Sequence, residues 1–279
     1  MSTRTSTRTG TRTTTAAATD LAELTRAAYD ALGVVIDPEL DEPITDLGFV
    51  RSLEVRPTAD GDLEVETHLR LPTSFCAPNF AYLMASDAKD VLDALPWTAR
   101  VVVELDDHHD SDLINRGLAA DAGYRGTFRH EAESDLDELR ATFQRKAHTA
   151  AMERALTSLL RSDADLAEAE VGRVVLGDLP DDATTAALLR RRADIGLGAD
   201  PLDRVLVDAD GTPYAEGEVP MALRRARSTR ISIEGNAHFC RGLLATRYPD
   251  EPTEPAFVSV GDLFAHTPSH TTREKETVA

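Results

Sequence analysis

The residue best placed to do chemistry is Cys76, which lies in a short loop, 72–78, directly before a predicted helix. A thiol just ahead of a helix N-terminus faces unpaired amide N–H groups and the positive end of the helix dipole, and both favour the thiolate. A thiolate can ligate iron or attack an electrophile. The plain alternative is a small buried hydrophobe between Phe75 and Pro78.

A second candidate group lies in the segment around Pro38, which Asp37 and Glu39 flank. Their carboxylates could supply hard oxygen ligands or a hydrogen bond to the cysteine loop. An Asp-Pro-Glu sequence is equally typical of a turn and helix-capping device. The sequence leaves both interpretations open.

Two histidine-containing segments raise the question of a metal site. His238 and Cys240 form the only other cluster of soft ligands, and together with Cys76 they would give a weaker candidate site of two cysteines and one histidine. The alternative for Cys240 is an ordinary buried cysteine. His108 and His109 lie among aspartates, but adjacent side chains point apart, so we favour a solvated acidic loop there.

A local basic stripe interrupts this acidic protein. It could pair with acidic loops of the same chain, dock an acidic client or form a solvated helix face, and the last interpretation is favoured. The stripe consists of Arg224, Arg225, Arg227 and Arg230.

Charge, cysteine content and missing motifs exclude several classes of protein. With 49 acidic and 30 basic side chains, the net charge is -19, which repels phosphate backbones and anionic membranes. The two cysteines form no CxxC pair, so neither a disulfide scaffold nor a Cys-rich zinc site is indicated. No Gly-rich phosphate loop, GxSxG or HExxH occurs. We expect a soluble cytoplasmic protein that is not an enzyme and binds neither nucleic acid nor membranes.

Apolar spacing predicts the elements that would position these residues. A helix should end at Gly33, a hairpin should follow, and a second helix should begin at Pro78 and lead to a further strand. Between the first helix and the hairpin we expect a structured loop with buried aliphatic anchors. The predicted ranges are 20–32 for the first helix, 50–56 and 62–71 for the hairpin, 78–95 for the second helix and 99–105 for the last strand.

We therefore predict an α+β fold: a small two-layer α-β-β-α-β N-terminal domain, then a long helix and a mixed α/β C-terminal extension. Ser134 should cap the long helix, which should reach about residue 160. In the extension we expect strands at 171–178, 203–208 and 230–234 and a helix at 183–192. The predicted boundaries are a disordered tail at 1–19, a domain at 20–118, a linker at 119–133, a helical or mixed region at 134–265 and a disordered tail at 266–279.

The segments Asp37-Pro38-Glu39-Leu40 and Ile44-x-Asp46-Leu47-Gly48-x-Val50, followed by the Cys76 loop, resemble the iron–sulfur cluster assembly protein domain. This family includes SufT-like proteins and the PaaD protein of phenylacetate degradation, and the resemblance spans residues 21–118. It implies a role in delivering iron–sulfur clusters or maturing iron-dependent oxygenases, with the loop cysteine required. By position, that cysteine is Cys76, and the supporting loop residues are Asp37, Glu39, Asp46, Gly48 and Thr73. The chain departs from the family pattern at Ala77, where a proline often follows the cysteine, and at 106–110, which replaces a Pro-x-Trp.

The resulting hypothesis is a bacterial maturation factor that assists the assembly of an iron–sulfur cluster or iron centre in a client enzyme through Cys76. We expect no stably bound cofactor, only transient iron or a transient cluster. The expected partners are a client metalloenzyme, such as a diiron oxygenase, or the iron–sulfur assembly machinery, and a homodimer is allowed. The alternative is a metal-free interaction or chaperone-like module for a multicomponent monooxygenase. A cysteine-dependent enzyme is disfavoured because no histidine lies near Cys76 in the sequence.

Overall fold

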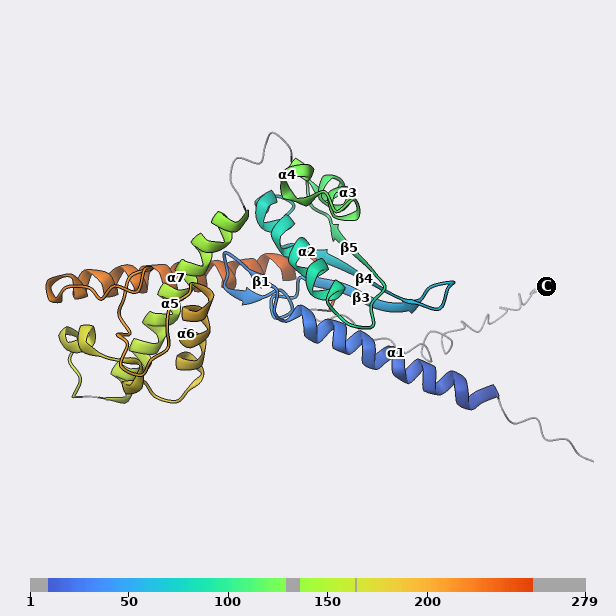
Figure 1. The fold of residues 1–279 in the computed structure, drawn as a ribbon. Coiled ribbons are helices and arrows are strands. Elements are labelled where there is room, and N and C mark those ends of the chain that lie inside the picture. The colour runs from blue at the N-terminus through green and yellow to red at the C-terminus, as the bar shows by residue number, and fades with distance from the viewer. Residues whose placement is uncertain (1–9, 129–135, 164, 253–279) are drawn as a thin grey trace, which may run out of the picture.

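The computed structural model describes residues 10–128, 136–163 and 165–252. It contains an N-terminal domain built on a small sheet and a C-terminal group of helices, with helix α7 running from the second region to the first (Figure 1). The predicted α+β class is confirmed. No helix within the described ranges combines the length and the apolar character that crossing a bilayer requires.

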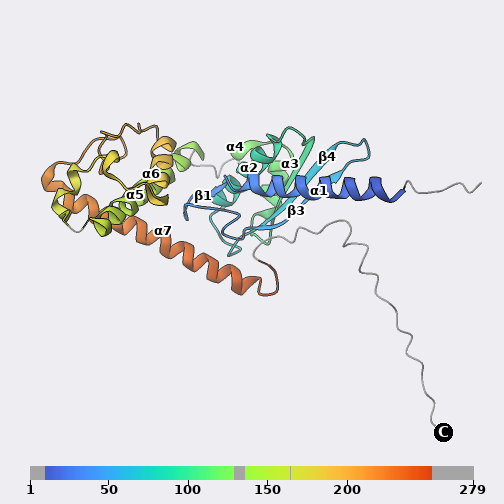
Figure 2. The same ribbon diagram turned by 90° about the horizontal axis from the view of Figure 1, so that it is seen from below.

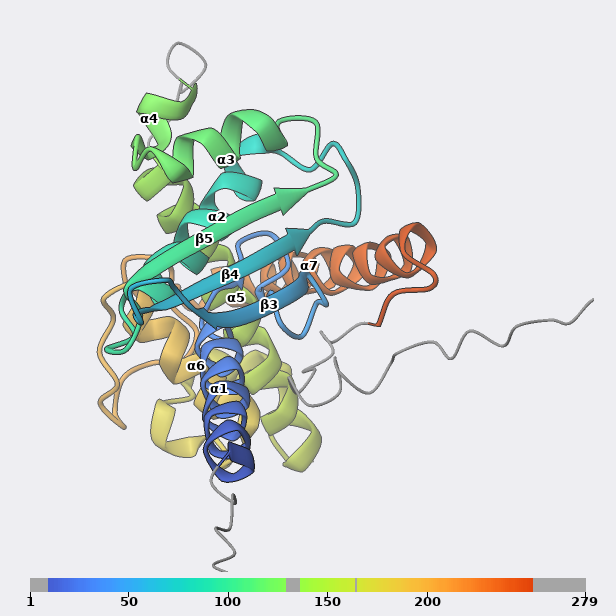
Figure 3. The ribbon, with the colours of Figure 1, turned by 90° about the vertical axis from the view of Figure 1, so that its right-hand side faces the viewer.

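The N-terminal sheet has three strands in the order β3-β4-β5. Strands β3 and β4 form the predicted antiparallel hairpin, whose turn includes Gly61 at a φ of 88°. Strand β5 lies parallel to β4, which requires a crossover, and α2 provides it. Helices α1 and α2 pack on the sheet (Figure 3). The bounds are β3 Val50–Pro57, β4 Leu63–Arg70, α2 Pro78–Asp93 and β5 Arg100–Asp106.

Helix α1 spans Gly10–Leu32 and begins ten residues earlier than expected. The prediction of a disordered tail is therefore wrong for residues 10–19, and residues 1–9 lie outside the described ranges. Three consecutive alanines at 16–18, the strongest helix formers, favour continuation of the helix on its N-terminal side. The predicted end is confirmed, because the Gly33 amide donates to the carbonyl of Asp30 at 3.1 Å.

The loop after α1 contains a two-stranded ladder of β1 (Ile36–Asp37) and β2 (Glu42–Pro43). Its aliphatic anchors Ile44 and Leu47 are buried in the domain core, as predicted. The Ile44 carbonyl accepts from the Phe49 amide at 2.9 Å, which closes the loop onto the start of the hairpin.

Two short helices follow β5: α3 (Ser111–Ala119) and α4 (Gly123–Phe128). The predicted linker at 119–133 is thus partly helical, because Phe128 is buried and packs edge-on against Tyr82 of α2. Ser134, the predicted cap of the next helix, lies outside the described residues.

The C-terminal region consists of α5 (Leu136–Ser162), α6 (Ala183–Asp194) and α7 (Val219–Arg247), joined by 3-10 turns. The predicted long helix and the helix at 183–192 are confirmed. The turns are η2 (Glu168–Arg173), η3 (Leu176–Asp178) and η4 (Glu216–Glu218).

The strands predicted in this region are wrong. Residues 171–178 and 203–208 contribute only isolated bridges, Val175 with Arg204 and Val207 with Pro213, beside the 3-10 turns. Residues 230–234 lie inside α7, where the alternation of Ile231 and Ile233 resembled a strand. Burial of one face of α7 overrides this local β-propensity, since Ile233 is buried and Ile231 is exposed.

Helix α7 belongs to both regions. Its first half packs with α5 in the C-terminal core, which includes Leu223 and Ala226. Its second half contributes Ala237 and Leu244 to the core of the N-terminal domain. The helix is long enough to do both, and Figure 2 shows it running from the C-terminal helices to the edge of the N-terminal domain. The N-terminal site is therefore partly built by the end of the chain.

Candidate functional site

Cys76 lies half-buried in the loop between β4 and α2. Pro78 occupies the first turn of α2, as predicted, so the cysteine stands just outside the helix N-terminus. The Thr73 hydroxyl lies 3.4 Å from the Cys76 sulfur, and it also accepts a hydrogen bond from the Phe75 amide at 3.3 Å. Thr73 thus shapes the loop and orients the thiol.

His108 holds the backbone of Cys76. Its Nε2 donates to the Cys76 carbonyl at 2.9 Å, and its Nδ1 accepts from the Asp110 amide at 3.1 Å. These contacts require the neutral ring with the proton on Nε2. The prediction of a solvated loop is wrong for this histidine, which is buried. The adjacent His109 donates its amide to the Ser74 carbonyl at 2.9 Å, so both histidines tie the segment after β5 to the cysteine loop.

The position of His108 beside the cysteine loop could have been predicted from the order of the strands and helices. Strands β4 and β5 are parallel, so their carboxyl ends meet at the same edge of the sheet. The loops that follow them, 71–77 and 107–110, must then lie close together. The sequence order alone, with a helix between two strands, contained this information.

Asp37 acts chiefly as a turn former. Only 7% of its surface is exposed, and its Oδ1 accepts from the amides of Glu39 and Leu40, both at 2.9 Å. Burial raises the pKa of Asp37 to about 6, although these two amides lower it. The sequence left open whether Asp37 is a ligand or stabilises a turn. The two hydrogen bonds from backbone amides support the second role.

Asp46 and Gly48 shape the other end of the same loop. Gly48 has a φ of 74°, the left-handed region that favours glycine. Its carbonyl accepts from Nε of the buried Arg70 at 3.1 Å. Asp46 is exposed and accepts from the Thr45 hydroxyl at 3.3 Å. Among the described residues, neither Asp46 nor Gly48 shares a hydrogen bond with Cys76.

Helix α7 spans the distance between the two loops. Asn236 donates to Glu39 at 3.3 Å. About three turns later, Arg247 donates from Nη1 to the Leu71 carbonyl at 3.0 Å and from Nη2 to the Ser74 hydroxyl at 2.9 Å. Arg247 also donates to the carbonyl of Asp107, the residue before His108, so it holds both loops. The C-terminal region therefore completes the site.

Cys240 lies on the same helix between these contacts and is also half-buried. Burial, Asp37, Cys76 and Glu39 raise the pKa of its thiol to about 11, so it is protonated at neutral pH and lies within electrostatic reach of all three. His238 is exposed, because two residues along a helix correspond to about 200° of rotation.

The predicted metal set of Cys76, His238 and Cys240 is therefore not assembled. Across the described parts of the chain, no group of three or more His, Cys, Asp or Glu side chains is arranged to hold a metal ion. His238 and Cys240 are two residues apart on helix α7, so their side chains leave the helix in different directions. Of the three residues, Cys76 and Cys240 are the two that interact, since Cys76 contributes to the raised pKa of the Cys240 thiol.

The basic stripe of α7 has a structural role. Nε of Arg227 donates to the buried Glu153 of α5 at 3.1 Å, and Arg230 pairs with the other oxygen of the same carboxylate. Arg224 donates to the Pro220 carbonyl of its own helix at 3.1 Å. Pairing within the chain, one of the three interpretations, is thus observed for two of the arginines.

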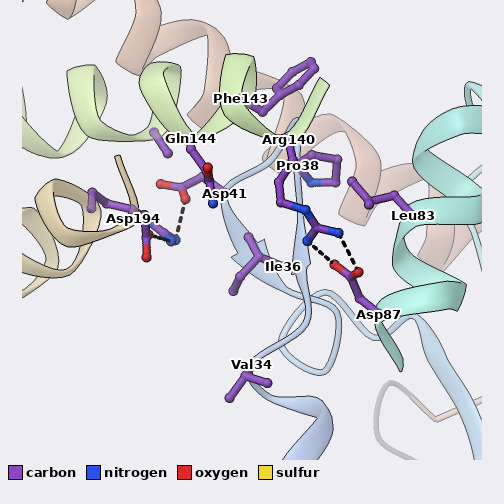
Figure 4. Close-up of a pocket in the computed structure, with 12 residues that line it drawn as sticks. Val34, Ile36, Pro38, Asp41, Leu83, Asp87, Arg140, Phe143, Gln144 and Asp194 are labelled. Carbon is purple, nitrogen blue, oxygen red and sulfur yellow. Dashed lines mark hydrogen bonds and ion pairs between the residues drawn. The ribbon is translucent and has the colours of Figure 1, made fainter. Parts of the chain in front are cut away.

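A cavity of about 210 Å³ lies between the first loop and helices α5 and α6 (Figure 4). Arg140 forms a bidentate pair with Asp87 at 2.7 and 2.9 Å, and Arg191 pairs with Asp41 at 2.5 Å. These charged groups on its walls bind one another, and the volume is below that of typical ligand pockets. The cavity is a seam between the two regions of the molecule.

Comparison with known proteins identifies the N-terminal domain. Residues 25–105 match the family described as iron-sulfur cluster assembly protein, so this domain belongs to that family, as its resemblance predicted. The match contains Cys76 and ends before His108 and α7. No solved structure gives a significant match.

The curated relatives match about a third of this chain. The chain is 36% identical over 103 residues to an iron-sulfur cluster carrier protein of Mycobacterium leprae, which covers 36% of this chain and 25% of the relative. It is 39% identical over 84 residues to carrier proteins of Mycobacterium bovis and Mycobacterium tuberculosis, covering 30% of this chain and 20% of each relative. The matched segment spans a quarter or less of the length of these relatives.

Proposed function

We propose that this protein assists the assembly or insertion of an iron–sulfur cluster or iron centre in a client enzyme, an oxygenase, and that Cys76 makes the contact with iron. The observation that carries the proposal is the setting of Cys76. In a domain of an iron–sulfur assembly family, its loop is held by Thr73, His108 and Arg247. The names of the curated relatives, which describe cluster carriers, support delivery of a cluster.

The chemistry of the site favours brief contact over storage. A cysteine thiolate is the usual ligand of iron in clusters, but Cys240 is held as a protonated thiol. Iron bound at Cys76 would thus keep open coordination positions, which the ligands of a client can fill. Such an exchange needs no bond-making catalysis by this chain, so the protein acts as a maturation factor and not as an enzyme.

The expected partners follow from the charge of the protein and from the proposed transfer of iron to the ligands of a client. A net charge of -19 disfavours nucleic acid and anionic membranes. The client metalloenzyme or the iron–sulfur assembly machinery of a bacterial cytoplasm would present the cysteine or carboxylate ligands. In a homodimer, two copies of Cys76 would supply two thiolates.

A transfer assay tests the proposal. The purified chain is incubated without oxygen with ferrous iron and sulfide, and apo-aconitase is added as a general acceptor. We expect the wild-type chain to raise the rate of aconitase activation above that of iron and sulfide alone. Cys76→Ala and Cys76→Ser should both abolish the gain. Cys76→Ser is the matched control, since it keeps the contact with Thr73 but removes the soft ligand. An unchanged gain in both variants contradicts the proposed role of the thiol.

A second candidate is the metal-free accessory module of a multicomponent monooxygenase, and one observation favours it. Phe75, directly beside Cys76, is 80% exposed. An exposed aromatic side chain on a fixed loop is typical of a protein-binding surface. This candidate predicts that Phe75→Ala lowers the amount of soluble client in cells whereas Cys76→Ala leaves it unchanged. Loss of client iron at a normal client level in Cys76→Ala cells contradicts it.

A further inference from the structure

Cys240 lies on a continuous stripe of α7 that faces the N-terminal site. Residues four and seven positions apart in a helix share one face. Asn236, Cys240 and Arg247 have this spacing, and the flanking two are fixed by hydrogen bonds to Glu39 and Ser74. Cys240 is about 6 Å along the axis from Asn236 and about 10 Å from Arg247.

Cys76 lies in the loop that the end of α7 contacts. It follows Ser74 by two residues, and Ser74 is the residue that Arg247 binds. Both cysteines pack, partly buried, against the same hydrophobic core. The loop of Cys76 is also fixed by His108, so it cannot swing far from the helix without breaking that hydrogen bond.

From this geometry we infer that Cys76 and Cys240 form a reversible intramolecular disulfide, which joins α7 to the N-terminal domain. The pair is remote in sequence and absent from the segment that matches the family, since Cys240 lies far beyond residue 105. The C-terminal region thus supplies a resolving thiol for the cysteine of the assembly domain.

The chemistry balances with a peroxide as oxidant. The Cys76 thiolate attacks one oxygen of hydrogen peroxide, the O–O bond breaks, and the departing hydroxide takes up a proton to form water. The thiol of Cys240 then attacks the sulfenic acid on Cys76, the S–O bond breaks, and the thiol proton leaves with the hydroxyl group as a second water. Two thiols lose two electrons, and the peroxide gains them. Excess dithiol reverses the change.

The consequence for iron rests on the proposed function. In the oxidised chain, Cys76 has no thiolate to offer, and α7 cannot move away from the site. Transfer of a cluster would stop under oxidative conditions and resume after reduction, without loss of the protein. The disulfide would also protect Cys76 from irreversible oxidation.

Counting thiols in the full chain tests the disulfide directly. The reduced chain is treated at low concentration with hydrogen peroxide, quenched and denatured. We expect both free thiols to disappear together, no disulfide to form between chains, and the mass of each chain to fall by two hydrogen atoms. Peptides containing Cys76 and Cys240 should be linked before reduction and separate after it.

The matched control moves the thiol by one residue. In Phe239→Cys combined with Cys240→Ser, the thiol turns by about 100° away from the stripe onto an exposed position, so closure should be roughly tenfold slower or slower still. The inference is overturned if this variant closes as fast as wild type, or if the wild-type chain keeps two free thiols or links only between molecules. Because the measurement involves no iron and no client, failure of the disulfide leaves the proposed function standing, and the reverse also holds.

Discussion

The two regions of this molecule bury polar groups for different purposes. In the N-terminal domain, buried Asp37, Arg70 and His108 lie at the ends of strands and hold the loop 37–48 and the Cys76 loop. In the C-terminal region, buried Glu153 and Arg192 link helices and turns to one another. Buried polar side chains therefore position the loops of the candidate site in the N-terminal domain. In the C-terminal region they hold the helices and turns together.

The largest effect should come from deleting apolar contacts in the two cores separately. Leu92 and Leu188 are fully buried, the first in the N-terminal core and the second in the C-terminal core. Each change to alanine should lower the free energy of unfolding of its own region by about 3 kcal/mol. Trp97, the only tryptophan, packs against the N-terminal core and reports on that region.

We expect Leu92→Ala to shift the urea transition of Trp97 fluorescence, and Leu188→Ala to shift mainly the helical circular dichroism. If the fluorescence and circular dichroism transitions shift together in both variants, the two regions unfold as one cooperative unit. That result would contradict the separate stability of the regions.

One buried group in each region should contribute to the acid response with opposite sign. Burial, with a contribution from Arg192, lowers the pKa of His148 from its usual 6.5 to about 4, so between these values the unfolded chain binds more protons and acidification destabilises the fold. Burial raises the pKa of Asp37 from 3.8 to about 6, so in that window the folded chain binds more protons and acidification stabilises it. Each effect should amount to at most about 3 kcal/mol.

The pH test compares each variant with the wild type, because other carboxyl groups titrate in the same range. Between pH 6.5 and 4, His148→Gln should lose less stability than the wild type in the helical signal. Over the same pH range, Asp37→Asn should lose more stability than the wild type in the Trp97 transition, because it lacks the stabilising protonation of Asp37. Changes of equal sign in the two variants would contradict the assigned burial of one of these groups.

A smaller effect is expected at the junction of α5 and α7. Glu153→Gln leaves Arg227 and Arg230 without their carboxylate, but both arginines are partly exposed and gain water. The loss should therefore be about 2 kcal/mol, below that of a fully buried pair. It should appear in the helical transition, while the Trp97 transition keeps its midpoint. Glu234→Gln, which removes an exposed carboxylate that pairs with Arg230, is the control and should change stability little.

The smallest effect should be local and confined to the end of α7. Arg247→Gln removes the hydrogen bonds to Leu71 and Ser74, at a cost of about 1 kcal/mol. Hydrogen exchange should accelerate in the loop 71–76 and in the last turns of α7. Arg224→Gln, whose recorded contact is to its own helix, should leave exchange in the loop unchanged. If hydrogen exchange in the loop 71–76 is unchanged in Arg247→Gln, α7 does not hold the cysteine loop in place.

Sequence reasoning succeeded where one local pattern determines one element. The alternation in β4 and the helical spacing of α2 predicted the N-terminal domain, and Gly33 and Pro78 marked helix ends correctly. It failed at Ile231 and Ile233, whose strand-like alternation is overridden by burial of one helix face.

The site was predictable only in part. Cys76 and the loop at 37–48 were proposed as site residues from motifs and spacing. Cys240 was proposed only as part of a weaker set with Cys76 and His238, and His238 is exposed on another face of α7. The roles of His108 and Arg247 depend on which loops meet at a sheet edge and on the path of α7, and these are tertiary facts that no local pattern contains.

The iron content of a client in cells tests the central claim most directly. The gene is deleted and complemented with wild type or Cys76→Ala, and iron is measured across chromatographic fractions of each extract together with the amount of every protein. The account predicts at least one fraction in which an iron protein is present at its normal level but has lost its iron in the Cys76→Ala cells. Full iron loading of all fractions in those cells would contradict it.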